Sequence, residues 1–179
     1  MSTQSPTVHS VHVYDQDLDL INRLCSIVST SLRIGDAVLI VSTQEHRDQL
    51  VQELEGAGID IRASVRQGRY TMLDAQEALS TFMRNGKPDC ELFAENICKP
   101  IADAHVRARS LGRGVTVFGE MVSVLWEQGN KGAALELEGL WNAALSDGSF
   151  HLHCAYPRNV FADDGEFRSV CETHSHVLQ

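Results

Sequence analysis

The chain is poor in positive charge and contains no long apolar run. Its 179 residues include 15 Lys and Arg against 24 Asp and Glu, which gives a formal net charge of -9. This balance argues against a nucleic-acid-binding surface and against docking on anionic membranes, because both need basic side chains. No apolar run approaches the roughly 20 residues that span a bilayer. Residues 1–8 are polar, lack the apolar core of a signal peptide and are predicted to be disordered, so we expect a cytoplasmic protein.

The common phosphate-binding motifs are absent as well. A P-loop ends in Gly-Lys-Ser/Thr, because backbone N–H groups and the Lys ammonium surround the phosphates, and the chain has no such sequence. Where that loop would follow the first strand, the chain carries Asp15, Asp17 and Asp19, which would repel phosphate. Gly112 and Gly114 precede a strand instead of following one, so they do not form a dinucleotide-binding turn. ATP or dinucleotide binding by the usual means is therefore unexpected.

Paired metal-binding or disulfide motifs are missing too. The five cysteines show neither a disulfide framework nor a CxxC pair, and we expect most of them to be reduced and buried. Near the end of the chain, Cys171, His174 and His176 could supply metal ligands, with Cys154 or His153 as a further one. Alternatively, His174 and His176 are histidines favoured by the negative end of a helix.

What the chain does have is a regular alternation of strand and helix patterns. This alternation predicts a three-layer α/β/α sandwich around a mostly parallel sheet, formed by a single domain over residues 9–179. The expected strands lie at 11–14, 37–41, 61–65, 69–73, 115–118 and 150–156. The longest expected helix covers 90–110, and the others lie at 15–28, 44–55, 74–83, 121–128, 131–145 and around 166–174.

The expected strand at 115–118 lies at the centre of the sheet, because its β-branched and aromatic residues suit burial on both faces. Glu120 follows it directly, at the carboxyl end, where open α/β sheets bind ligands. Alternatively, Glu120 only caps the next helix.

His9 and Tyr14 bracket the first strand, and we expect their surroundings to include Glu120 and Cys154. A lone Tyr14 could also be a core aromatic whose hydroxyl is satisfied at the rim. Glu136 and Glu138, on the helix at 131–145, are expected to be solvated. No hydrolase signature of the Gly-x-Ser-x-Gly kind appears.

An ordered set of short segments carries a family resemblance. The segments lie at 9–15, 35–43, 58–60, 68–75, 117–122, 125–126, 137–142, 154–157 and 171–177, and they include Phe-Gly-Glu-Met-Val, Cys-Ala-Tyr-Pro and Cys-x-x-His-Ser-His. Together they resemble the MEDS domain, the methanogen/methylotroph DcmR sensory domain, over about residues 9–178.

This resemblance implies a degenerate RecA/KaiC-like core that has lost its P-loop and acts as a sensor instead of an enzyme. Family members occur with histidine kinases or DNA-binding modules and are proposed to detect small molecules such as hydrocarbon derivatives. The positions that the resemblance marks are His9, Tyr14, Glu120, Cys154, Cys171 and His174. No output domain is recognised in this chain, so it is either a stand-alone regulator or the sensor part of one.

Three functions follow as hypotheses. The first is a non-enzymatic sensor that binds a small molecule through His9, Tyr14, Glu120, Cys154 and His174 and relays to a histidine kinase or transcription regulator. The second is a ligand-independent protein–protein interaction module, with apolar surface on the helix at 90–110 or on the tail that could support a homodimer. The third is a metalloenzyme that uses the Cys/His tail, with Glu120 as general base.

Overall fold

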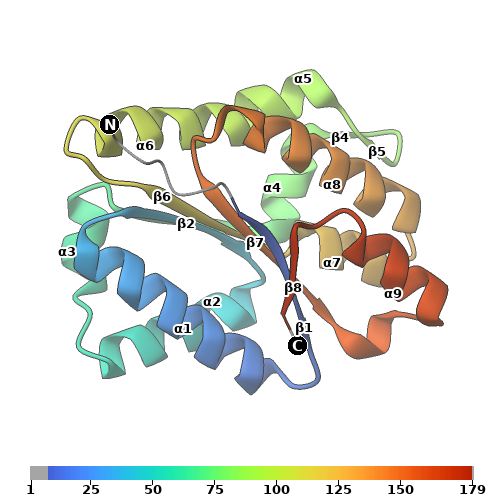
Figure 1. Ribbon diagram of the computed structural model, residues 1–179, viewed down its shortest axis with the longest axis horizontal. Helices are drawn as coiled ribbons and strands as arrows, with labels where there is room; N and C mark the ends of the chain where they lie inside the picture. The colour runs from blue at the N-terminus through green and yellow to red at the C-terminus, as the bar shows by residue number, and fades with distance from the viewer. Residues whose placement is uncertain (1–7, 179) are drawn as a thin grey trace.

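The computed structural model describes residues 8–178 and shows a six-stranded parallel sheet between two layers of helices (Figure 1). Every neighbouring pair of strands in this sheet is parallel. The predicted three-layer α/β/α fold is therefore confirmed. In spatial order the strands are β3 (Tyr70–Asp74), β2 (Ala37–Ser42), β6 (Val115–Gly119), β7 (His151–Pro157), β1 (His9–Tyr14) and β8 (His176–Leu178).

Strand β6 is an inner strand, as its sequence predicts. It pairs with β2 on one side and β7 on the other, and all five of its residues are buried. Val117 belongs to the apolar core on one face of the sheet, whereas Phe118 belongs to the core on the other face. An inner strand needs apolar side chains in both directions, which explains why this segment shows no polar alternation.

Helices cover both faces of the sheet (Figure 1). One face packs against α1 (Asp17–Ile34), α2 (Gln44–Gly56) and α3 (Ile61–Arg66). The other packs against α4 (Ala75–Phe82), α5 (Cys90–Phe93), the π-helix η1 (Ala94–Cys98), α6 (Lys99–Arg109), α7 (Met121–Glu127), α8 (Lys131–Ala144) and α9 (Asp164–Cys171). Short 3₁₀ turns, η2 (Leu145–Asp147) and η3 (Arg158–Val160), flank β7. Among residues 8–178, no helix has the length and apolar character needed to cross a bilayer.

The helix predicted at 90–110 is continuous but not uniform. It runs through α5, the π-helix η1 and α6. Pro100 lies at the start of α6, immediately after the π-helical segment. In a regular α-helix the proline ring would clash with the carbonyl of Asn96, four residues earlier. The π-helix η1 has a wider turn than an α-helix and lies where this clash would occur. The proline therefore accounts for the position of η1.

The strand predicted at 61–65 is wrong, because these residues form helix α3. The carboxylate of Asp60 accepts a hydrogen bond from the Ala63 N–H at 2.7 Å and caps the helix. Burial follows helical spacing, with Ile61 and Ser64 buried three residues apart. Five residues are too few for periodicity alone to separate the two structures, so the cap was the better signal.

The two ends of the chain also differ from the prediction. The predicted helix around 166–174 is α9, which ends at Cys171, and the unpredicted strand β8 then pairs with β1 at the edge of the sheet (Figure 1). Residues 1–7, predicted to be disordered, lie outside the described residues. Val8, from the same predicted segment, is described, and its carbonyl accepts a hydrogen bond from the Leu152 N–H at 2.8 Å.

A small antiparallel hairpin follows α4, formed by β4 (Met83–Arg84) and β5 (Lys87–Pro88). Asn85 and Gly86 form its two-residue turn with φ values of 50° and 78°. Two consecutive positive φ angles are typical of a type I′ turn, which asparagine and glycine tolerate best.

Candidate functional site

The residues predicted to bind one ligand lie in two separate places. His9 begins β1 beside Leu152, whereas Tyr14 ends β1 beside Pro157. Five residues of strand span about 16 Å, and an odd separation turns two side chains to opposite faces. Tyr14 lies with Glu120 at the carboxyl edge of the sheet, in a hollow that we call the edge pocket. His9 lies with Cys154 and His174 in a group that we call the buried cluster.

Glu120 anchors the edge pocket. Its side chain is nearly fully buried, and Oε2 accepts a hydrogen bond from the Thr43 N–H at 3.0 Å. Its Oε1 lies 2.5 Å from Nδ1 of His46. Glu120 is the N-cap residue of α7, as the helix-cap alternative has it, but its side chain makes no capping hydrogen bond to that helix. Instead, Glu120 joins the end of the central strand to the start of α2, where Thr43 is the N-cap.

The partner of Glu120, His46, is not among the site residues predicted from the sequence. Its Nε2 lies 3.5 Å from Oδ1 of Asp17, on the side opposite Glu120. Burial opposes charge on this imidazole, but the hydrogen bond and charge of Glu120, together with the charge of Asp17, raise the pKa of His46 above its usual value. The missed signal was positional: His46 lies one turn into the helix after β2, the neighbour of β6.

The edge pocket is a cavity of about 630 Å³ with a mixed lining. Trp126, Val124 and Val160 form an apolar wall. Burial, with the negative charges of Glu120 and Asp17, raises the pKa of Tyr14, so its hydroxyl stays protonated and can donate. The whole lining is Tyr14, Asp17, Thr43, Glu45, His46, Glu120, Ser123, Val124, Trp126, Glu127, Pro157, Asn159 and Val160.

The charge of the pocket selects for positive groups. Its lining holds four carboxylates and, in His46, one group that can carry positive charge. Partial burial raises the pKa of Glu127 above its usual value against the opposing hydrogen bond from Ser123, and repulsion from Glu120 adds to the rise. Such a lining repels phosphate. The connection from β1 to α1 consists of Asp15 and Gln16 alone, which leaves no room for a phosphate-binding loop.

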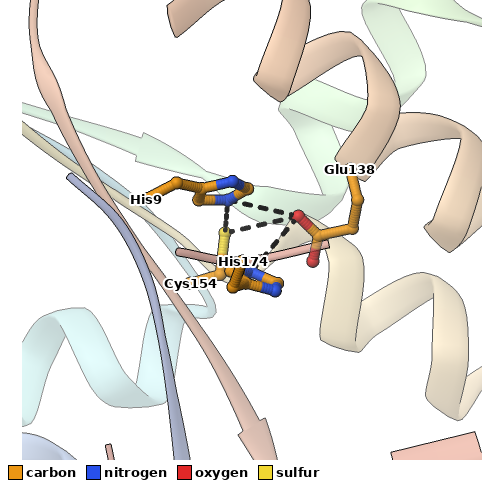
Figure 2. Close-up of side chains that lie close together, drawn as sticks. All are labelled: His9, Glu138, Cys154 and His174. Carbon is orange, nitrogen blue, oxygen red and sulfur yellow. Dashed lines mark hydrogen bonds and ion pairs between the residues drawn. The ribbon is translucent and has the colours of Figure 1, made fainter. Parts of the chain in front are cut away.

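The buried cluster brings four donor side chains together from four elements (Figure 2). His9 comes from β1, Cys154 from β7 and Glu138 from α8, and His174 precedes β8. Their donor atoms all lie within 4.8 Å of one another, and the side chains point toward a shared centre (Figure 2). Both His9 Nε2 and His174 Nε2 lie 3.4 Å from Glu138 Oε2. The Cys154 Sγ lies 3.5 Å from His9 Nε2 and 3.8 Å from Glu138 Oε2.

Glu138 was expected to be solvated, and that expectation is wrong. Its side chain is 0% exposed. It shares the buried face of α8 with Ala134, Leu137 and Trp141, at helical spacings of three and four residues. A carboxylate within such an apolar stripe is a signal that the sequence carried. Exposed Glu136, which pairs with Lys87 across 3.4 Å, does fit the expectation.

A second set of contacts orients the cluster. The Asn142 amide nitrogen donates to the Thr173 carbonyl at 2.9 Å, which leaves its oxygen to accept from His9 Nδ1 at 2.8 Å. The Val170 carbonyl accepts from His174 Nδ1 at 2.8 Å. Carbonyl oxygens only accept, so both Nδ1 atoms carry a proton and both Nε2 atoms face the centre.

The remaining carboxylate oxygen and the thiol are also constrained. Tyr156 donates its hydroxyl hydrogen to Glu138 Oε1 at 2.9 Å. Complete burial, with the charge of Glu138, raises the pKa of the Cys154 thiol well above its usual value. Burial lowers the pKa of His174 even though Glu138 opposes this. Burial in the cluster therefore favours a neutral Cys154 thiol and a neutral His174.

The structure brings only part of the predicted metal-ligand set together. His174 is in the buried cluster, whereas Cys171, at the end of α9, and exposed His176 are not among its donors. His153 faces the other side of the sheet, where Ser10 Oγ lies 2.6 Å from its Nδ1 and burial lowers its pKa to about 4. Glu120, the general base of the metalloenzyme hypothesis, lies in the edge pocket and not beside these donors.

The expectation that most cysteines are buried is also wrong. Cys154 is fully buried, but Cys90 is exposed and Cys25, Cys98 and Cys171 are only partly buried. Cys154 is thus the one cysteine of the five that is fully buried.

Comparison with known proteins identifies the family. The family model for MEDS, the methanogen/methylotroph DcmR sensory domain, matches residues 8–175, so the chain belongs to this family and the predicted resemblance is confirmed. A crystal structure of the uncharacterized protein PH0321 from Pyrococcus horikoshii, in complex with an unknown peptide, is similar in fold, with a TM-score of 0.67 and 16% identity. The similarity covers 97% of this chain and 77% of that one. No match was found among curated proteins.

Proposed function

We propose that this MEDS domain is a non-enzymatic sensor that binds a small organic molecule in the edge pocket and relays binding to a signalling or transcriptional partner. The observation that carries the proposal is the buried Glu120–His46 pair in the lining of the edge pocket, beside the central strand. Carboxyl ends of inner strands are where open α/β sheets bind ligands. Membership of a sensory-domain family supports a sensing role.

The lining supports a particular ligand chemistry. Four carboxylates with a single imidazole favour a ligand that donates hydrogen bonds or carries positive charge, such as a small protonated amine. The apolar wall that includes Trp126 would contact the hydrocarbon part of the same molecule, and an aromatic face also attracts cations. Inorganic phosphate and nucleotides are disfavoured by the same charges.

The relay runs through the wall of the pocket. Pro157, Asn159 and Val160 line the cavity and belong to the segment that leads from β7 to α9. The Trp126 indole N–H donates to the Val160 carbonyl at 3.2 Å and holds this segment in place. A ligand that contacts Trp126 changes the packing of this segment and hence of α9, which is the surface that we assign to the partner.

The experiment is a thermal-shift screen with matched sets of small amines and small carboxylates. Amines should raise the melting temperature of the protein and carboxylates should not. The shift should be lost in Glu120→Gln and retained in Glu136→Gln, which alters an exposed carboxylate on α8. Calorimetric titration well below the melting temperature separates lost binding from lost stability. No hit in either set, or hits that survive Glu120→Gln, would contradict the proposal.

A ligand-independent interaction module is the second candidate, and exposed apolar side chains favour it. Val106, near the end of α6, is 69% exposed and Leu111, just beyond it, is 75% exposed. These two residues lie at the end of the helix predicted to support a homodimer. Val106→Lys and Leu111→Lys should weaken self-association in sedimentation experiments if this surface binds a second copy. Partner capture that no small molecule alters would favour this function over the sensor.

A further inference from the structure

Four of the six separations among the donors of the buried cluster are close to those of a tetrahedral metal site, and all six are within 4.8 Å. Zn²⁺ binds imidazole nitrogen at about 2.0–2.1 Å and thiolate sulfur at about 2.3 Å, which places donors in a tetrahedron roughly 3.3–3.7 Å apart. The two nitrogen-to-oxygen separations are both 3.4 Å, and the sulfur lies 3.5 Å from a nitrogen. The sulfur-to-oxygen separation of 3.8 Å is close to this range.

The hydrogen bonds of the cluster turn the ligand atoms of both imidazoles toward its centre, where the Cys154 thiol donates to Glu138 Oε2 at 3.8 Å. Both imidazoles donate Nδ1–H outward, to Asn142 and to the Val170 carbonyl, so their Nε2 atoms point inward. His174 Nε2 is fully buried and has no hydrogen-bond partner, although the Glu138 carboxylate oxygen is only 3.4 Å away. The long contact of the Cys154 thiol leaves these converging buried polar atoms poorly satisfied, and a cation between them would offset that cost.

The contacts around the donors match those of a metal site. Metal-binding histidines usually donate their other N–H to a carbonyl, amide or carboxylate, which fixes the ring orientation. Asn142 does this for His9 and Val170 does it for His174. Tyr156 occupies the second carboxylate oxygen of Glu138, which leaves Oε2 for single-oxygen coordination.

From these observations we propose that His9, Glu138, Cys154 and His174 form a Zn²⁺ site. This site holds the C-terminal segment, residues 174–178, against the sheet. Two imidazoles, a thiolate and a carboxylate suit Zn²⁺, which accepts nitrogen, sulfur and oxygen ligands in tetrahedral geometry. Four protein ligands leave no open position, so the site is structural and not catalytic. Binding releases one proton, from the Cys154 thiol to solvent, and involves no oxidation or reduction.

The site couples metal binding to the position of the C-terminal segment. His174 is the one ligand on that segment, and its side chain is 0% exposed. Ser175 follows directly, and its N–H and hydroxyl both donate to the His9 carbonyl at 2.8 Å. Zn²⁺ therefore stabilises the docking of β8 against β1, independently of any ligand in the edge pocket.

The first test measures metal in the full-length protein, purified without affinity tags that bind metal and without chelators. Elemental analysis should find about one Zn per chain. After Zn²⁺ is removed under reducing conditions, titration with Co²⁺ should give the absorption of tetrahedral cobalt with a thiolate-to-cobalt charge-transfer band. Protein with only background metal that also shows no cobalt–thiolate band would overturn the proposal without any mutation.

Variants then identify the ligands, and the sequence offers matched controls. Cys154→Ser should abolish the cobalt–thiolate band, and His174→Gln should weaken Co²⁺ binding at least tenfold. Cys171→Ser and His176→Gln alter the same residue types nearby and should bind Co²⁺ like the wild type. Loss of the band in Cys171→Ser with retention in Cys154→Ser would overturn this ligand set. Where a cluster variant fails to fold, the wild-type cobalt spectrum and the two controls still decide the question.

Hydrogen exchange tests the coupling to the C-terminal segment. Addition of Zn²⁺ to the metal-free protein should slow amide exchange over residues 174–178 and in β1, while exchange in α2 beside the edge pocket stays unchanged. Equal exchange of the C-terminal segment with and without bound Zn²⁺ would refute the fastening role even if a metal binds.

Discussion

The edge pocket and the buried cluster use the same residue types in opposite ways. In the edge pocket, His46 turns Nδ1 toward the Glu120 carboxylate, at 2.5 Å, so a proton lies between them. In the buried cluster, both histidines turn Nδ1–H outward and present Nε2 to Glu138 at 3.4 Å. A carboxylate lies near each of these histidines, so its presence does not explain the difference. The group that the other ring nitrogen contacts decides whether a histidine shares a proton with the carboxylate or leaves a space that suits a metal.

The two regions also differ in access. Glu120 lies at the floor of a cavity, where exposed Asp17 and Glu45 line the rim. Glu138 is enclosed by side chains from β1, β7, α8 and the C-terminal segment (Figure 2). An open site can exchange a small molecule quickly, whereas an enclosed one exchanges its contents only when an element moves. This contrast suits a ligand sensor in the first and a structural metal in the second.

The largest expected effect comes from removal of the central carboxylate of the buried cluster. Glu138→Ala should lower the free energy of unfolding by about 3–5 kcal/mol, because it leaves the buried Tyr156 hydroxyl without its acceptor and opens a cavity in the core. Urea denaturation of metal-loaded and metal-free protein measures the change. Glu136→Ala on the exposed face of α8 should stay within about 0.5 kcal/mol of wild type. A similar small loss for both variants would show that the cluster does not stabilise the fold.

A smaller effect is expected from the residue that orients His9. Asn142→Ala should weaken metal binding by about 10–100-fold, because His9 loses the acceptor that fixes its tautomer. Asn142→Asp retains an acceptor and should recover most of the affinity. Competition of Co²⁺ against a chelator of known affinity measures both. Equal affinity for all three proteins would mean that the outer partner does not set the orientation of the ring.

The smallest effect concerns the proton in the edge pocket. The folded-state pKa of His46 is raised above its unfolded value, so its stabilisation is fully present below the unfolded pKa of about 6.5 and is lost as the pH rises through the folded pKa. The stability difference between wild type and His46→Gln should therefore be larger near pH 6 than near pH 9. Chemical denaturation at several pH values measures it, with His176→Gln as the exposed control. A difference that does not change with pH would contradict a proton shared with Glu120.

Much of the architecture was predictable because it depends on local patterns. The apolar runs of β2 and β6, and the amphipathic stripes of α1 and α8, indicated a parallel sheet covered by helices on both faces. The misassigned helix α3 is six residues long, and the unpredicted strand β8 is three residues long. Elements this short are determined by their tertiary neighbours as much as by their own periodicity.

The candidate sites were predictable only in part. Glu120 was placed at the carboxyl edge because a strand and a helix meet at that residue. The separation of His9 from Tyr14 followed from strand geometry that the sequence already implied, since the two residues bracket one strand. The inward turn of Glu138 was visible in the apolar spacing of its helix, but a charged residue there is expected at the surface in most proteins.

Local sequence patterns were enough to predict the layers of the fold, the absence of a phosphate-binding loop and the position of Glu120 beside the central strand. Each of these depends on residues within a few positions of one another. Only the tertiary structure decided which donors meet: His9 and Cys154 are 145 positions apart, and strand pairing brings them together. The rotation of α8 and the return of the chain at β8 then add Glu138 and His174. Such contacts depend on non-local register and packing, which local periodicity does not encode.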